Sequence, residues 1–211
     1  MRYPGPTKVP GDKSTESYQE GPKVVPGSYG VRLSAGGQNR EASFQIVEDP
    51  RVAATQQDLQ AQFDLLLQIR DKLSRTHEAI NTIRNLSSQA GEWQRRVKGQ
   101  TNEQQIVDAA KALSGKLTAI EKVLIQPKAE DPRQLPPGLN EKLAALTVFV
   151  DADDARPTQQ AKEAFAELST QIDAQLDALQ QVVQTDLPAF DRLIREAGVP
   201  ALVPSAEPVK R

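Results

Sequence analysis

The stretch that decides the fold is residues 59–97, which reads LQAQFDLLLQIRDKLSRTHEAINTIRNLSSQAGEWQRRV. Its apolar residues recur at the three- and four-residue spacing that places side chains on one face of an α-helix. That face consists of Leu59, Leu66, Ile69, Leu73, Ile80, Ile83, Ala90 and Val97, extended by Leu86 and Trp93. Four polar residues interrupt it: Gln62, Thr76, Ser87 and Gln94. The pattern predicts one long helix that packs along a single face.

Signals at both ends delimit this helix. Thr55-x-x-Asp58 resembles a capping box, in which two side chains satisfy free backbone N–H groups at a helix start. Basic residues precede Gly99, and a helix C-terminus favours both cations and a following glycine. We therefore expect the helix to run from Thr55 to Lys98, a length of about 65 Å.

Two helices are expected next. The first opens at a second capping box, Thr101-x-x-Gln104, and ends before Pro127. Its inward face would be Ile106, Ala110, Leu113, Leu117, Ile120 and Leu124. After a Pro-containing linker (128–137), a short helix spans about Leu139 to Val150. Its inward face would be Leu139, Leu143, Leu146 and Phe149.

A last long helix begins at Pro157-Thr158 and ends near Gly198. Pro188 lacks a backbone donor and is expected to kink or break it. Its apolar stripe would be Phe165, Leu168, Ile172, Leu176, Leu179, Val183, Phe190 and Ile194. The middle two helices together match the first in length. We therefore expect them end to end along the first, with the last helix as the third member of an elongated antiparallel bundle.

The N-terminal 49 residues differ from the rest, since they are rich in Gly, Pro and Ser. Residues 28–34 and 40–47 alternate between apolar and polar, and Ala35-Gly36-Gly37-Gln38 between them suits a tight turn, so a β-hairpin is predicted. Its apolar face would carry Tyr29, Val31, Leu33, Ala42, Phe44 and Ile46. A lone hairpin is marginal in water. Its apolar face must therefore cover the helices, a partner, or strands not present here.

Composition excludes several classes of protein. The 211 residues are 38% hydrophobic and only 4% aromatic, which suits helix seams built from Leu, Ile, Val and Ala. With a net charge of −2 and no basic face, nucleic-acid binding is not expected. There is no cysteine for disulfides or thiolate metal sites. No run of about 18 apolar residues could span a membrane, and the N-terminus carries no signal-peptide pattern.

Few residues suggest chemistry. His77 is the single histidine, and without a matching nucleophile or further imidazoles we expect a structural or surface role. Asp151, Asp153 and Asp154 could bind calcium, but the loop lacks the glycine and final glutamate of an EF-hand. Capping of the next helix or simple solvation is the favoured interpretation. Trp93 is expected to be a core or hairpin-end anchor, with a partner contact as the alternative. We expect no catalytic residues, no metal and no cofactor.

Several short motifs point to one family. They are Arg2-Tyr3-Pro4-Gly5, Gly21-Pro22, 26–33 (PGSYGVRL), Asp49-Pro50-Arg51-Val52, Asp58-Leu59-Gln60, Phe63-Asp64, Pro157-Thr158-Gln159 and Ala197-Gly198-Val199-Pro200. Together they resemble the C-terminal region of large bacterial proteins with BNR/Asp-box repeats, often labelled glycosyl hydrolase or sortilin (VPS10)-like. The resemblance implies β-propellers followed by an Ig-like strand domain and a helical region, and it implies export. The propeller, with its Ser-x-Asp-x-Gly-x-Thr-Trp boxes, is absent from this chain, so no catalytic residue carries over.

These observations predict three segments: a Gly/Pro-rich part with the hairpin, as the remnant of an Ig-like sandwich (1–49), a helical bundle (50–198) and a Pro-containing tail (199–211). The expected function is a non-catalytic structural or protein-interaction module, not an enzyme, whose partner is a propeller domain or a second copy. Two alternatives stay open. One is the tail of a sialidase-like glycosyl hydrolase that needs the missing propeller. The other is a self-associating, coiled-coil-like oligomer.

Overall fold

The computed structural model describes residues 1–15, 20–126 and 136–199, and helices dominate it. The predicted linker falls mainly, and the predicted tail almost entirely, outside these ranges. The strands are β1 (Gly27–Ala35) and β2 (Gln38–Ile46). The helices are α1 (Gln56–Arg96), α2 (Glu103–Leu124), α3 (Leu139–Val150), α4 (Gln159–Gln181), the π-helical turn η2 (Val182–Asp186) and α5 (Leu187–Glu196). The prediction of a mainly α protein with a short N-terminal hairpin is confirmed.

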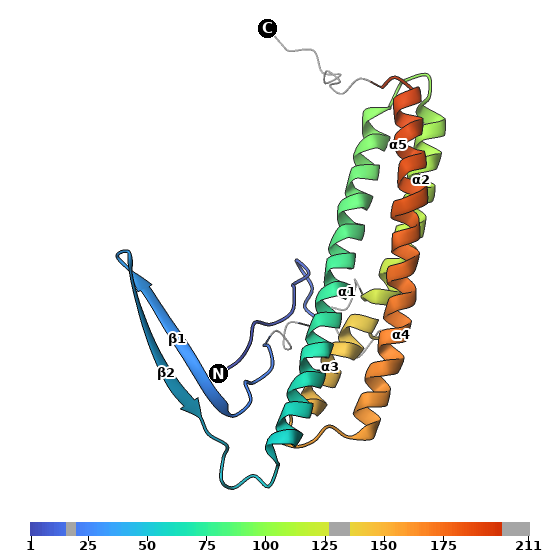
Figure 1. Ribbon diagram of the computed structural model, residues 1–211. Helices are drawn as coiled ribbons and strands as arrows, with labels where there is room; N and C mark the ends of the chain where they lie inside the picture. Colours follow the sequence, from blue (N-terminus) through green and yellow to red (C-terminus); the bar gives the residue numbers. More distant parts are fainter. Residues whose placement is uncertain (16–19, 127–135, 200–211) are drawn as a thin grey trace.

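The helices form the elongated antiparallel bundle expected from their lengths (Figure 1). α2 and α3 run one after the other back along α1, and both contact it. α4, η2 and α5 form one nearly continuous rod, which packs on α2 and α3 and also contacts α1. A cross-section of the bundle therefore meets three helices.

The capping prediction holds for α1 and fails for α2. Thr55 accepts a hydrogen bond from the backbone N–H of Asp58, and the Asp58 carboxylate accepts one from the N–H of Thr55, which completes the box. α2 instead begins after Asn102, with no side-chain cap. The Glu103 carboxylate reaches back to the N–H of Gly99 (2.6 Å). The tight α1–α2 turn places Gly99 at φ +79° and shifts the start beyond Thr101.

The core follows the predicted stripes of α1 and α2, and all six expected α2 residues are buried. Two of the polar interruptions in α1 are buried as well, and both are satisfied. Thr76 donates from its hydroxyl to the carbonyl of Lys72 (2.8 Å), and Gln62 donates to the carbonyls of Val150 and Asp153. A buried polar group costs little when its hydrogen bonds are made.

One prediction for α3 is wrong. Leu139, Leu143 and Leu146 are buried as expected, but the Phe149 side chain is 78% exposed and Val150 takes the inward position. The inward residues follow the spacing 139, 143, 146, 150, which is the regular alternation of four and three residues that keeps one face of a helix inward. Phe149 falls on the outer side of this arc.

The last helix is interrupted where Pro188 predicted, but by a change of helix type. In η2 the N–H of Leu187 bonds to the carbonyl of Val182, an i→i−5 bond that widens the turn just ahead of Pro188. The extra residue also shifts the apolar stripe. Val182 is buried and the expected Val183 is exposed, while Phe190 returns to the core. The prediction for Val183 is therefore corrected.

The first residues of the chain are part of the helical body. Residues 4–12, here called the N-terminal strap, run along α1 and bury Val9 in its core. α1 binds the strap backbone through three side chains: Ser74 accepts from the N–H of Thr7, Asn81 donates to the carbonyl of Lys8, and Arg84 donates to that of Pro10. Tyr3 also packs on Phe63, with ring centroids 5.1 Å apart.

Candidate functional site

The candidate functional site is the β-hairpin. Its shape follows from its turn. Gly36 and Gly37 have φ of +55° and +75°, which suits a two-residue hairpin turn that only glycine and a few other residues accept easily. The register runs without a bulge from Ala35↔Gln38 to Gly27↔Ile46. Side chains therefore alternate strictly between two faces along both strands.

One face of the hairpin is apolar and uncovered. It carries Tyr29 and Phe44, which stack on each other with centroids 6.0 Å apart, and then Val31 and Leu33 toward the tip. The side chains of Val31 and Leu33 are 51% and 66% exposed. No residue of β1 or β2 has its Cα within 8 Å of a helix residue, and the hairpin projects away from the bundle (Figure 1). Among the open possibilities for this face, cover by the described helices is therefore excluded.

The other face of the hairpin is polar and satisfied by itself. Arg32 forms an ion pair with Glu41 directly across the strands (2.7 Å), and Ser34 donates a hydrogen bond to Asn39 (2.6 Å). Cross-strand pairs of this kind hold the two strands in register. The polar face needs no cover, whereas the apolar face exposes large side chains to solvent.

Contacts at its base join the hairpin to the bundle. The Tyr29 hydroxyl donates to the carbonyl of Val25 (2.6 Å), and Gln56 at the start of α1 donates to the carbonyl of Pro26 (2.9 Å). Ile46 lines a small pocket together with Leu59 of α1. The hairpin is thus held at one end only.

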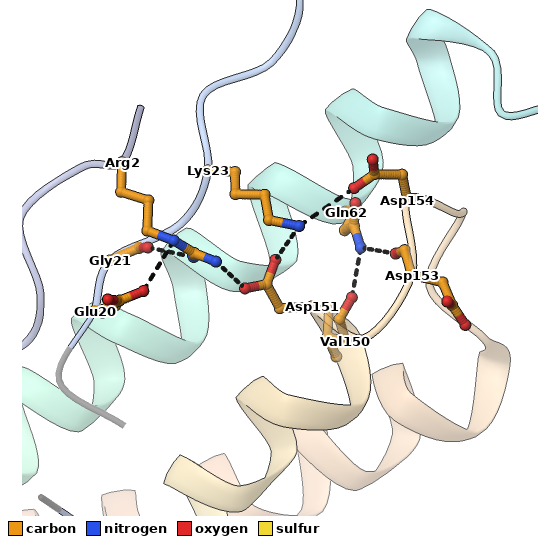
Figure 2. A network of polar contacts seen from close by, with 9 residues as sticks. All are labelled: Arg2, Glu20, Gly21, Lys23, Gln62, Val150, Asp151, Asp153 and Asp154. Atoms are coloured by element: carbon orange, nitrogen blue, oxygen red, sulfur yellow. Dashed lines mark hydrogen bonds and ion pairs between the residues drawn. The ribbon is translucent and has the colours of Figure 1, made fainter. Parts of the chain in front are cut away.

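The acidic loop after α3 is neutralised by the N-terminal segment (Figure 2). Asp151 pairs with Arg2 (2.9 Å) and lies 3.8 Å from Lys23, which also pairs with Asp154 (3.5 Å). Asp153 contributes its backbone carbonyl to Gln62. In the part of the chain that the structure describes, no group of three acidic, His or Cys side chains could hold a metal ion. The loop does not cap α4, which Thr158 caps instead.

Gly21 allows the two N-terminal segments that carry Arg2 and Lys23 to approach each other closely. The segments around Tyr3 and Pro22 run antiparallel, with the N–H of Tyr3 bonded to the carbonyl of Pro22 (2.9 Å). A Cβ at Gly21 would collide with the carbonyl oxygens of Tyr3 and Pro4. The close approach requires a glycine, and it presents Arg2 to the carbonyl of Gly21 (2.9 Å) and to Asp151.

His77 is buried under the strap. Its Nδ1 lies 2.5 Å from the carbonyl oxygen of Thr7, and its Nε2 lies 3.5 Å from the Nδ2 of Asn140. A carbonyl accepts and an amide nitrogen donates, so this geometry assigns the neutral ring with its proton on Nδ1. Burial lowers the pKa of His77, against the raising effects of the Thr7 carbonyl and Asp12.

Asp12 lies beside this ring, in a pocket that it lines with His77 and Thr15. Its carboxylate accepts hydrogen bonds from the hydroxyls of Thr15 (2.6 Å) and Ser14 (2.7 Å). Burial acts to raise the pKa of Asp12, but these hydrogen bonds and the proximity of His77 lower it overall. The hydroxyls donate to Asp12 rather than to His77, so the arrangement does not activate a nucleophile.

Trp93 lies near the C-terminal end of α1. It is half-buried and packs against the core, and the guanidinium of Arg96 lies 4.7 Å from its ring centroid. This matches the predicted core anchor. A cation over the indole face adds a modest attraction of its own.

Sequence patterns placed the hairpin and its faces correctly, but they missed the strap. The residues that receive it on α1 are ordinary surface residues in the helical pattern, and nothing local marks them as partners of Thr7 or Lys8. No helix in the described ranges is both long and apolar enough to cross a membrane. Comparison with protein-family models, curated proteins and solved structures gave no match to this chain.

Proposed function

We propose that this protein is a non-catalytic protein-interaction module, in which the helical bundle is a rigid support and the β-hairpin is the contact element. The observation that carries the proposal is the apolar face of the hairpin, with Val31 and Leu33 more than half exposed and no helix against it. Large exposed apolar side chains gathered on one face are typical of interaction sites.

The other candidate groups support this assignment by being engaged inside the protein. Both ring nitrogens of His77 lie against partners in the strap and α3. Asp151 and Asp154 lie in ion pairs with Arg2 and Lys23. These contacts stabilise the fold and leave none of these groups arranged around a reacting molecule.

The proposal extends to the family that the sequence resembles. In a protein of the BNR/Asp-box class, a hairpin followed by a helical region would adjoin a strand domain and a propeller, and the partner would be such a neighbour. The genomic sequence upstream of Met1 tests this extension. A reading frame for propeller repeats would support it, and a neighbouring gene without such repeats would count against it.

Site-specific photo-crosslinking tests the interaction itself. A photoreactive phenylalanine analogue at Leu33 should give a crosslinked species of higher mass in the cells that naturally make the protein. The matched control is the same analogue at Glu92, which is exposed on α1 far from the hairpin. No crosslink at position 33, or equal yields at both positions, would contradict the proposal.

A further inference from the structure

The outer edges of the hairpin are as open as its apolar face. Each strand is nine residues long, and the described residues contain no third strand in this sheet. Neither strand contains proline or lysine, and the register has no bulge. These are the devices that usually protect an edge strand from pairing with another chain. The one acidic residue of the strands, Glu41, is neutralised within the hairpin by Arg32.

The apolar face of the hairpin is too small to form a stable interface with the same face of a second copy of this chain. Nine residues at about 3.4 Å each give a length of about 30 Å, and two strands give a width of about 10 Å. Two hairpins packed face to face would then bury roughly 600 Å² in total, about half of what a specific interface needs. Pairing two copies edge to edge would leave both apolar faces exposed.

The two edges are not equivalent. Along the apolar face β1 presents Val31 and Leu33, while β2 presents Ala42 and Arg40 at the same levels. The Arg40 side chain makes no hydrogen bond or ion pair with any residue that the structure describes. A strand added beside β1 would continue the apolar surface, whereas one added beside β2 would meet a charged side chain. The β1 edge is therefore the favoured side.

We propose that β1 is the docking edge for a β-sheet of a different protein or domain, whose edge strand pairs with β1 and whose apolar side chains cover Val31 and Leu33. The inference rests on the proposed function, because it names the partner class of the same hairpin. Such a partner satisfies the open backbone groups and the apolar face together, which neither arrangement of two copies does.

The hairpin geometry identifies which backbone groups the partner would use. In a two-residue hairpin the Ala35↔Gln38 pair is hydrogen-bonded, and bonded and non-bonded pairs alternate from there. Gly30, Arg32 and Ser34 therefore direct their N–H and carbonyl groups outward from β1. A proline at position 30 removes an outward donor without breaking the β1–β2 ladder.

The test compares Gly30→Pro with Gly30→Ala, each carrying the photoreactive analogue at Leu33. Alanine is a fair control because a Cβ at Gly30 meets no atom within 4 Å. We expect Gly30→Pro to lower the crosslink yield about tenfold or more, as loss of main-chain pairing would, and Gly30→Ala to leave it unchanged. Amide exchange at Val31 should stay the same in both variants, which shows that the hairpin remains formed.

Sequencing of the crosslinked peptide completes the test. The expected attachment site is an edge strand of a β-sheet in another protein or domain. Attachment to a helix, attachment to a second copy of this chain, or equal yields for the proline and alanine variants would overturn the inference while the interaction itself stood. Absence of any crosslink from the unsubstituted Gly30 chain would reject both the inference and the proposed function.

Discussion

At the scale of single residues, His77 joins three parts of the chain. Its ring lies between the strap carbonyl of Thr7 and the side chain of Asn140 on α3. Asn140 also lies 3.4 Å from the Asp12 carboxylate, which closes a polar cluster under the strap. The ring must stay neutral for Nε2 to accept from Asn140, so the cluster depends on protonation.

This dependence gives a pH prediction. Because burial lowers the pKa of His77 in the folded protein, the unfolded chain binds the proton more readily. The contribution of His77 to stability is therefore full above about pH 6.5 and is lost as the pH falls below it, by at most about 1.4 kcal/mol per pH unit. Urea denaturation between pH 7.5 and 5.5 should show the free energy of unfolding falling.

The control for this prediction is His77→Asn, which keeps a donor near the Nδ1 position but does not titrate. Its free energy of unfolding should change less over the same range. Asp12 does not contribute to a change between pH 7.5 and 5.5. Its pKa is lowered in the folded protein, so its effect on stability appears as the pH approaches its ordinary pKa of 3.8. If the free energy of unfolding changed equally with pH in the unsubstituted protein and in His77→Asn, His77 would not be the source of the pH dependence.

A second residue-scale prediction follows from the corrected face of α3. Leu143→Ala should lower the free energy of unfolding by about 2–5 kcal/mol, because Leu143 is fully buried. Phe149→Ser should change it by less than about 0.5 kcal/mol, because Phe149 is exposed. Thermal unfolding of both variants measures the difference, and a larger loss for Phe149→Ser would reverse this assignment.

At the scale of elements, the π-helical turn lets the last helix pass Pro188 and still bury Phe190. Val182→Ala should therefore destabilise the protein by about 1 kcal/mol or more, and Val183→Ala by less than about 0.5 kcal/mol. Chemical denaturation of the pair checks this. Equal losses would mean that the helix runs through this region without the extra residue.

The elements also show what a sequence can and cannot predict. The Gly36-Gly37 turn and the alternation on either side are local, so the hairpin and both its faces were predictable. The stripes of α1 and α2 were predictable for the same reason. Val183 was misplaced because a change of helix type decides which residues turn inward there, and a uniform helical period does not contain that change. Phe149 was misplaced by the choice of spacing, since a regular helical period through Leu143 and Leu146 leads to Val150.

At the scale of the whole molecule, the unpredicted contacts are the long-range ones. The strap lies on α1 about seventy positions away in the chain, held by bonds such as Thr7 to Ser74. Arg2 and Lys23 pair with Asp151 and Asp154 in an acidic loop for which the sequence favoured helix capping or solvation. These pairings depend on the three-dimensional path of residues 1–24, which has no periodic signal.

Two neighbouring N-terminal segments therefore have different roles in the molecule. Residues 1–15 cover the bundle and contribute Val9 to its core, whereas residues 27–46 stand clear of the helices (Figure 1). The strap is expected to be needed for folding. The hairpin is expected to be dispensable for folding and needed only for contact with a partner.

Chemical denaturation of a chain in which residues 27–46 are replaced by two glycines tests this division most directly. The strand ends at Gly27 and Ile46 are paired, so a short bridge can join the flanking segments. We predict a free energy of unfolding within about 1 kcal/mol of the full chain, since no strand residue has its Cα within 8 Å of a helix residue and Ile46 alone lines a pocket with α1. A loss of several kcal/mol would make the hairpin part of the folded core and would contradict its assignment as a free contact surface.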